Sequence, residues 1–134
     1  MVIQESSLDT DFVRDITGGP TTVFVGSIDH QPLATSERLI VFHLTNVLNK
    51  GMKFGEAGMY QIIDLGTSDK LVKRGSATIT IPNQSNRAQV FAIDLNGKRT
   101  AVVPFEYNEN NDIVFTAETI ATDRPNNLIY EITR

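Results

Sequence analysis

The chain has 134 residues with 40% apolar and 21% charged side chains, a formal net charge of −4 and no cysteine. This length predicts a single domain that buries about two thirds of its unfolded-chain surface. The composition excludes disulfides and thiolate metal sites, argues against nucleic acid, which needs a basic face, and offers no apolar run near the ~18 residues of a membrane span.

The N-terminal stretch, residues 1–20, is polar and ends in a Thr-Gly-Gly-Pro breaker. We expect an N-terminal edge segment or linker there, with an edge strand over residues 11–16, and a separate β-sandwich domain over residues 21–134. The stretch lacks the basic start and apolar core of a signal peptide. The protein is therefore expected to be cytoplasmic if the chain is complete, and secreted or periplasmic if it was excised from a longer one.

The first two strands of the sandwich domain are predicted at residues 21–28 and 38–45. The earlier segment is rich in β-branched and aromatic residues, with Val23 and Val25 on one face and Phe24 on the other. The later segment is apolar on both faces. Such a strand is typically central in its sheet and covered on both sides.

The middle of the chain is less regular. Residues 46–58 contain three glycines and are predicted to form an irregular loop. A strand is expected at residues 59–64, and a short helix over 56–64 is the alternative, although glycine disfavours it. Residues 70–74 predict a short basic strand.

Strands crowd the last third of the chain and are separated by Asn-rich turns. They are predicted at residues 77–82, 88–95, 100–107, 112–117 and 128–133. Asn96-Gly97 marks a hairpin, because both residues tolerate positive φ. Pro104 indicates an edge or a bulge, since it cannot donate to a ladder. Phe91 and Phe115 are assigned to faces that point into the core.

About 8–9 short strands with frequent turns predict an all-β fold. The expected architecture is an antiparallel β-sandwich, either Ig-like or jelly-roll-like. A closed barrel is the alternative.

His30 and His43 are the only histidines. His43 shares a strand face with Leu39 and Val41, so it is either a metal ligand or general base, or a half-buried histidine hydrogen-bonded to a neighbouring strand. The second interpretation is favoured, because no spacing ties His43 to a second ligand and a metal site needs three or four. His30 is predicted to be exposed in a turn. We expect neither a metal site nor a cofactor.

A sugar hydrolase needs two carboxylates that face each other across the scissile bond. The candidates are Asp29, Glu37, Asp64, Asp94, Glu106, Glu118 and Glu131. Most lie on strands whose other face is apolar, which makes them solvated outer-face residues, and Asp94 fits turn chemistry better. No pair stands out, and neither a Gly-x-Ser-x-Gly motif nor a phosphate-binding glycine loop occurs. We therefore predict no catalytic residue.

Sugar-binding modules often stack pyranose rings on exposed aromatic side chains, especially Trp. This chain has no Trp and three Tyr. Tyr107 and Tyr130 fall on predicted core faces, which leaves Tyr60, with Phe54 nearby in the glycine-rich region, as the candidate carbohydrate-binding residue. The competing interpretation is an aromatic plug over the open end of the core.

Several stretches of the chain resemble a known family. They are residues 32–54, 71–79, 90–99 and 128–132. They include a distinctive Leu-Asn-Lys-Gly-Met-Lys-Phe segment and an Ala-Ile-Asp-Leu-Asn-Gly-Lys-Arg hairpin. Together they resemble the C-terminal β-sandwich accessory domain that follows the catalytic barrel in large bacterial polysaccharide-degrading glycoside hydrolases. The resemblance covers most of residues 21–134.

This resemblance implies a non-catalytic accessory domain that packs on a catalytic domain, in the same or a longer polypeptide, and stabilises it. The family's catalytic carboxylates lie on the barrel, so none is carried over to this chain. Polysaccharide is a further candidate partner. One alternative is an autonomous carbohydrate-binding module that uses Tyr60, and a second is a small polysaccharide hydrolase.

Overall fold

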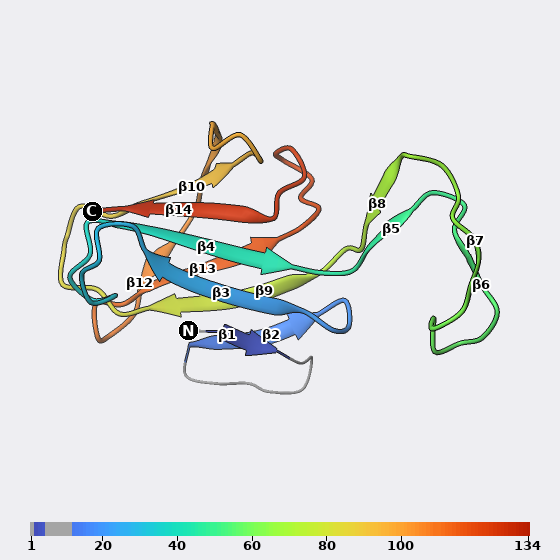
Figure 1. Cartoon of the computed structure of the whole chain (residues 1–134). Helices are drawn as coiled ribbons and strands as arrows, with labels where there is room; N and C mark the ends of the chain where they lie inside the picture. The colour runs from blue at the N-terminus through green and yellow to red at the C-terminus, as the bar shows by residue number, and fades with distance from the viewer. Residues whose placement is uncertain (1, 5–11) are drawn as a thin grey trace.

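The computed structural model describes residues 2–4 and 12–134. These residues form antiparallel sheets without a helix, so the described part of the chain has no helical membrane span. Two sheets pack face to face, and a long β-arm projects from one end of the sandwich (Figure 1). The predicted all-β antiparallel sandwich is confirmed, and the edge strands of its two sheets are not paired with each other in the described residues.

The first sheet has six strands. Their order is β1 (Val2–Gln4), β3 (Thr22–Ser27), β4 (Arg38–Leu44), β14 (Ile129–Thr133), β10 (Gln89–Ile93) and β11 (Arg99–Val103). Strict alternation decides which side chains point inward. Val23 and Val25 of β3 are buried, whereas Phe24 lies on the outer face, as predicted.

The second sheet has four strands. Their order is β12 (Glu106–Tyr107), β13 (Ile113–Glu118), β9 (Ser76–Ile81) and β2 (Val13–Thr17). The edge strand expected over residues 11–16 is therefore observed at β2, which pairs with β9. Val13 is fully buried and contributes to the core of the sandwich.

The core lies between the two sheets and is built from β-branched and aromatic side chains. Phe115 of β13 contacts Tyr130 of β14, with ring centroids 5.4 Å apart. Both residues are buried, and each belongs to a different sheet. The pair therefore joins the two layers at the centre of the sandwich.

The pairing of the arm was not predicted from the sequence. The arm comprises two antiparallel ribbons: β5 (Val47–Asn49) with β8 (Lys70–Val72), and β6 (Lys53–Phe54) with β7 (Ile62–Asp64). The irregular loop predicted at 46–58 is wrong, and the alternative helix over 56–64 does not form. β7 and β8 lie within the strands predicted at 59–64 and 70–74, whereas β1, β5 and β6 were not predicted and raise the strand number above the expected 8–9.

The arm's glycines explain the error. Gly51 and Gly66 both have positive φ, and a Cβ added to Gly66 would lie 2.4 Å from the Lys50 carbonyl oxygen. Only glycine accepts such a backbone approach without strain. These glycines therefore fix turns within a paired ribbon, whereas in the sequence they suggest a loop.

The strand predicted over residues 100–107 is divided between the sheets. β11 ends at Val103 in the first sheet, and β12 begins at Glu106 in the second. Pro104, which cannot donate to a ladder, lies at this crossing. The crossing leaves Tyr107 substantially exposed, so its predicted core position is wrong, whereas that of Tyr130 is correct.

The inward assignment of Phe91 is also wrong. Its strand neighbours Val90 and Ala92 are fully buried, which places Phe91 on the outer face of the first sheet. The guanidinium of Arg99 lies over the Phe91 ring, 4.0 Å from its centroid. All of Val90 to Ile93 is apolar, so the sequence alternation does not reveal which face is inward.

Phe115 and Phe91 provide a matched test of these two environments. We expect Phe115→Ala to lower the free energy of unfolding by ~3–5 kcal/mol, because it empties a buried site. Phe91→Ala should cost about 1 kcal/mol, mainly the Arg99 contact and partial burial. Urea denaturation of both variants measures the difference, and equal losses would contradict the assignment of the two faces.

Candidate functional site

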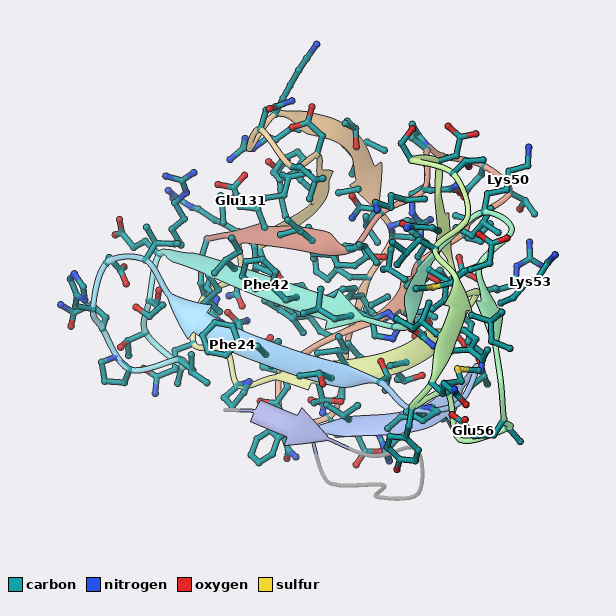
Figure 2. The ribbon with its side chains drawn as sticks, turned by 45° about the vertical axis from the view of Figure 1, so that its right-hand side comes forward. Phe24, Phe42, Lys50, Lys53, Glu56 and Glu131 are labelled. Carbon is teal, nitrogen blue, oxygen red and sulfur yellow. The ribbon has the colours of Figure 1, made fainter. Side chains whose placement is uncertain are left out.

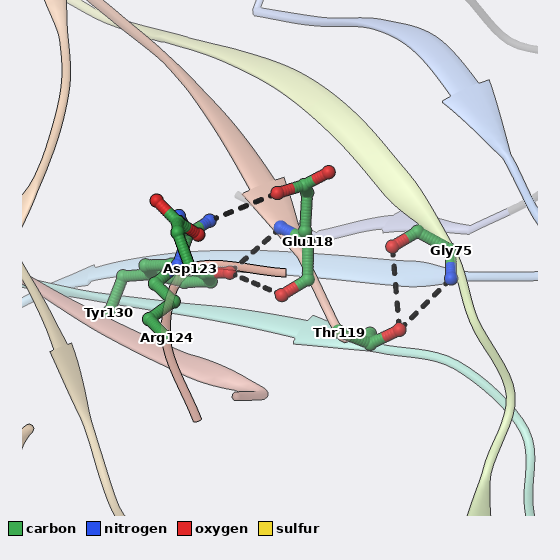
Figure 3. A network of polar contacts seen from close by, with 6 residues as sticks. All are labelled: Gly75, Glu118, Thr119, Asp123, Arg124 and Tyr130. Carbon is green, nitrogen blue, oxygen red and sulfur yellow. Dashed lines mark hydrogen bonds and ion pairs between the residues drawn. The ribbon is translucent and has the colours of Figure 1, made fainter. Parts of the chain in front are cut away.

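The base of the arm is held by a buried threonine (Figure 3). Thr119 follows β13 directly and is fully buried. Its Oγ1 accepts a hydrogen bond from the Gly75 backbone N–H at 2.9 Å and donates to the Lys73 carbonyl at 2.9 Å. These contacts fix the backbone where the returning limb of the arm re-enters β9.

Similar hydrogen bonds fix the backbone at residues 45–46, where the chain leaves β4 and enters the arm. The Thr45 hydroxyl donates to the Lys73 carbonyl at 2.7 Å, and the Lys73 N–H donates to the Asn46 carbonyl at 2.8 Å. Thr21 adds a hydroxyl bond to the Leu44 carbonyl, just before the chain leaves the sandwich. Threonine hydroxyls thus bond the backbone on both sides of the base.

A second group of polar contacts lies beside the hydrogen bonds of Thr119. The Tyr130 hydroxyl donates to the Glu118 carbonyl and accepts from the Glu118 N–H, both at 2.8 Å. The Arg124 side chain, only 7% exposed, forms ion pairs with Glu118 at 3.3 Å and Asp123 at 3.2 Å. Burial raises the pKa of Tyr130, so its hydroxyl stays protonated as a donor.

Beyond its base the arm is unusually apolar on its surface. Half of the 14 exposed large apolar side chains in the described residues lie on it: Val47, Met59, Tyr60, Ile62, Ile63, Leu65 and Leu71. Figure 1 shows that the arm extends away from the sandwich, so the core does not cover them. An apolar surface of this kind commonly marks an interaction site.

The tip of the arm presents Tyr60, whose side chain is 93% exposed. Polar contacts close the tip: a Glu56 carboxylate oxygen accepts from the Gln61 N–H at 2.7 Å, and the Gly55 N–H donates to the Gln61 carbonyl. No described aromatic ring pairs with Tyr60, Phe54 included. Tyr60 also lines none of the five described cavities.

The arm has a higher density of cations than the rest of the chain. Residues 46–74 contain five Lys or Arg and three Asp or Glu, in a chain whose net charge is −4. Lys50, Lys53 and Glu56 are distributed along the arm (Figure 2). Lys53 lies 4.0 Å from Asp64 across the second ribbon, an exposed pair of little energetic weight.

The candidate carboxylates have structural roles in several cases. Asp29 accepts hydrogen bonds from the Ser27 and Ser36 hydroxyls and from the Glu37 N–H, which lower its pKa. Asp94 accepts from backbone N–H groups of its own turn, chiefly that of Lys98, and its pKa is lowered as well. Only Gly97 has positive φ in this turn, which closes the predicted hairpin.

The cavities do not bring carboxylates together. The five described cavities are each lined by at most one acidic side chain. One of about 430 Å³ lies at the base of the arm, between Thr22, Leu44 and Lys73, and has no carboxylate. A pair of facing carboxylates, as sugar hydrolysis requires, is therefore not found in these cavities.

His43 is a buried and unpaired histidine. Its residue exposure is 0%, and neither ring nitrogen has a hydrogen-bond partner among the described residues. The expected half-buried ring bonded to a neighbouring strand is wrong: His43 bonds through its backbone, whose N–H donates to the Leu128 carbonyl. Burial lowers the pKa of His43 to about 4. No cluster of potential metal ligands occurs in the described residues.

The structure thus defines an antiparallel β-sandwich with a clasped, apolar and locally basic β-arm. Comparisons with family models, with curated proteins and with solved structures find no match to this chain. The sequence predicted strands at 59–64 and 70–74, which contain β7 and β8, but not their pairing with β6 and β5.

The buried imidazole predicts a specific acid sensitivity. Unfolded His43 binds a proton near pH 6.5, whereas the folded form resists protonation until about pH 4. The unfolded state therefore binds more protons between these values, and stability falls as the pH falls through this window, by ~3 kcal/mol in full. Denaturant titrations at steps from pH 7 to 4 measure this loss.

Two variants separate His43 from the other titrating groups. His43→Leu should remove most of the loss between pH 6.5 and 4, while His30→Gln, at an exposed turn, should leave it unchanged. The carboxylates with lowered pKa act at the acid end, because their contribution is lost only below their unfolded values, 3.8 for Asp29 and Asp94 and 4.5 for Glu131. An unaltered profile in His43→Leu would refute the assignment.

Proposed function

We propose that the chain is a non-catalytic accessory β-sandwich of a carbohydrate-active enzyme, which docks on the catalytic domain through its β-arm. The observation that carries this proposal is the arm itself. It displays half of the exposed large apolar side chains of the described residues, on two ribbons clasped at the base. The family resemblance supplies the kind of partner.

The physical argument concerns the cost of an exposed apolar arm. Isolated two-stranded ribbons are marginally stable in water, and exposed side chains such as Ile63 and Leu65 gain nothing from the sandwich core. Burial against a partner would contribute roughly 25 cal/mol for each Å² of apolar surface. The arm therefore has a thermodynamic reason to be covered.

The carboxylates support the non-catalytic part of the proposal. Asp29 and Asp94 organise turns, Glu118 pairs with Arg124, and Glu131 pairs with two arginines. Catalysis by an acid and a base requires two such groups at one cleft. A small hydrolase is accordingly the least supported alternative.

An autonomous carbohydrate-binding module is the second candidate. Its supporting observation is the 93% exposure of Tyr60, which leaves the ring face available for stacking. However, no ring in the described part of the chain pairs with Tyr60, and Tyr60 lines none of the five described cavities. Sugar sites usually combine such a platform with convergent polar groups in a concave surface.

Photo-crosslinking tests the docking proposal. A p-benzoylphenylalanine replacing Tyr60, in protein made by the cells that naturally produce it, should crosslink to a polysaccharide-degrading catalytic domain, in the same polypeptide or another. The matched control places the same group at Asn110, an exposed turn away from the arm. Mass spectrometry identifies the linked peptides. Linkage to unrelated proteins only, or equal linkage from both positions, would contradict the proposal.

Affinity gel electrophoresis separates the second candidate from the first. We expect no retardation of the chain by a panel of soluble polysaccharides, because Tyr60 lacks a supporting groove. Retardation that disappears in Tyr60→Ala, while Tyr107→Ala retains it, would instead establish a carbohydrate-binding module. Urea denaturation of both variants checks that the fold is preserved.

A further inference from the structure

The outer face of the six-stranded sheet is largely apolar, and none of residues 2–4 and 12–134 forms a layer over it. It carries Phe24, Ile40, Phe42, Leu44, Phe91 and Val102, side chains that are partly or substantially exposed. Phe24 and Phe42 contact each other across β3 and β4, with ring centroids 5.9 Å apart. β4 was expected to have a layer on both faces, and no described residue supplies the second. We call this surface the outer apolar face.

A charged group interrupts the outer apolar face. Glu131 of β14 accepts a hydrogen bond from the Arg38 Nε at 2.5 Å and from the Arg99 Nε at 2.6 Å. The register places Arg38 on β4 and Arg99 on β11, so the triad crosses the sheet. Figure 2 shows Glu131 on the strand next to Phe42.

The burial within this triad is uneven. The Glu131 side chain is 6% exposed, whereas those of Arg38 and Arg99 are 59% and 48% exposed. The hydrogen bonds of Arg99 and Arg38 lower the pKa of Glu131, so the carboxylate stays ionised. The triad therefore has one covered negative charge and two accessible positive charges.

The free edges of the two guanidinium groups are the important feature. Each arginine donates to Glu131 through Nε, and its two Nη groups have no hydrogen bond to a described residue. Glu131 orients both groups, and the Phe91 ring supports Arg99 from below. A guanidinium held in this way retains two donors suited to the planar geometry of a second carboxylate.

We propose that this triad is the acceptor site for a carboxylate side chain on the docking surface of the partner catalytic domain. The carboxylate would bind the free Nη edges of Arg38 and Arg99, while apolar side chains around it cover Phe24 and Phe42. The site has a net charge of +1 in a chain of net charge −4, so it selects an acidic group. This inference rests on the proposed function and names the chemistry of its partner.

The surroundings favour a protein carboxylate over that of an acidic sugar. A sugar would bring several hydroxyl groups, each needing a donor or acceptor when it is removed from water. The neighbours Ile40, Phe42 and Val102 offer only apolar atoms. The polar side chains beside them are Thr133, paired with Arg38, and Gln89, paired with Thr133. The apolar neighbours match a protein surface, in which one charged group sits among aliphatic and aromatic side chains.

Two matched peptides test the site on the intact chain. They are tripeptides capped at both ends, Phe-Glu-Phe and Phe-Gln-Phe, which differ only in charge. In NMR titrations the Glu peptide should shift the side-chain Nε–H signals of Arg38 and Arg99 and the ring signals of Phe24 and Phe42. We expect the Gln peptide to bind at least about fivefold more weakly than the Glu peptide, because it cannot form the charge-assisted hydrogen bond.

Variants separate binding from folding. Changing Arg38, Arg99 and Glu131 together to Gln leaves no unpaired buried charge, so the sheet should stay folded while the preference for the Glu peptide disappears. Arg14→Gln removes an exposed cation from the other sheet and should leave the preference unchanged. A preference that survives in the triple variant, or no shift at the triad with millimolar Glu peptide, would overturn the proposal.

A titration with glucuronate tests whether the triad binds the carboxylate of an acidic sugar instead of a protein carboxylate. We expect it to leave the Arg38 and Arg99 signals unmoved at concentrations where the Glu peptide shifts them, and stronger binding of glucuronate would overturn the protein assignment. If no crosslink to a catalytic domain forms from position 60, the proposed accessory function is contradicted. If the chain binds the Glu and Gln peptides equally, only the proposed carboxylate site is contradicted.

Discussion

Tyr130 carries its hydroxyl group from the six-stranded sheet across the core to the backbone of Glu118, in the other sheet. This residue is fully buried, and it satisfies one N–H and one carbonyl at the end of β13. A buried backbone group without a partner costs about 1–3 kcal/mol, so the position of Glu118 is strongly constrained. Thr119 follows it directly and binds Gly75 and Lys73. The placement of the arm thus depends on a contact made in the core.

The arm combines a rigid base with weakly supported ribbons. Its strands have two or three residues each, and their apolar side chains remain in water. Such elements open more readily than a packed core. The close approach at Gly66 and the polar contacts of Glu56 restrict the turn and the tip. This restriction lowers the ordering cost that a partner meets when it covers the arm.

Prediction from the sequence succeeded where β-branched or aromatic core residues alternate with other residue types along a strand. In β3, β9 and β13 the alternation marks the buried side chains, and Val23, Ile79 and Phe115 lie in the core. It failed in β10, where four consecutive residues are apolar and the sequence does not show which of them point into the core. Their orientation is set by packing against the opposite sheet, which no local pattern contains.

The arm shows a second limit of local patterns. Glycines at 51, 55 and 58 are typical of loops, but in this chain Gly51 serves a turn at the end of the first ribbon. The pairing of β5 with β8 joins residues 21 to 25 positions apart, and a local window does not detect it. Tyr60 was selected because of its type, and the structure adds that it stands exposed at the tip. The charged triad joins three strands and was likewise invisible in the sequence.

β4 connects the two surfaces assigned to docking. Its outward side chains Ile40 and Phe42 belong to the outer apolar face, and its end at Leu44 leads into the arm. A partner that contacts both surfaces binds two sites joined by one rigid strand, so the second contact forms at high effective concentration. Each surface alone can then have a low affinity for the partner, as expected for two short ribbons and for a site that accepts one carboxylate. The basic arm and the cationic triad also favour the same kind of partner surface, one that is apolar with acidic groups. Apolar burial would supply the affinity of this contact, and the charges would fix its register.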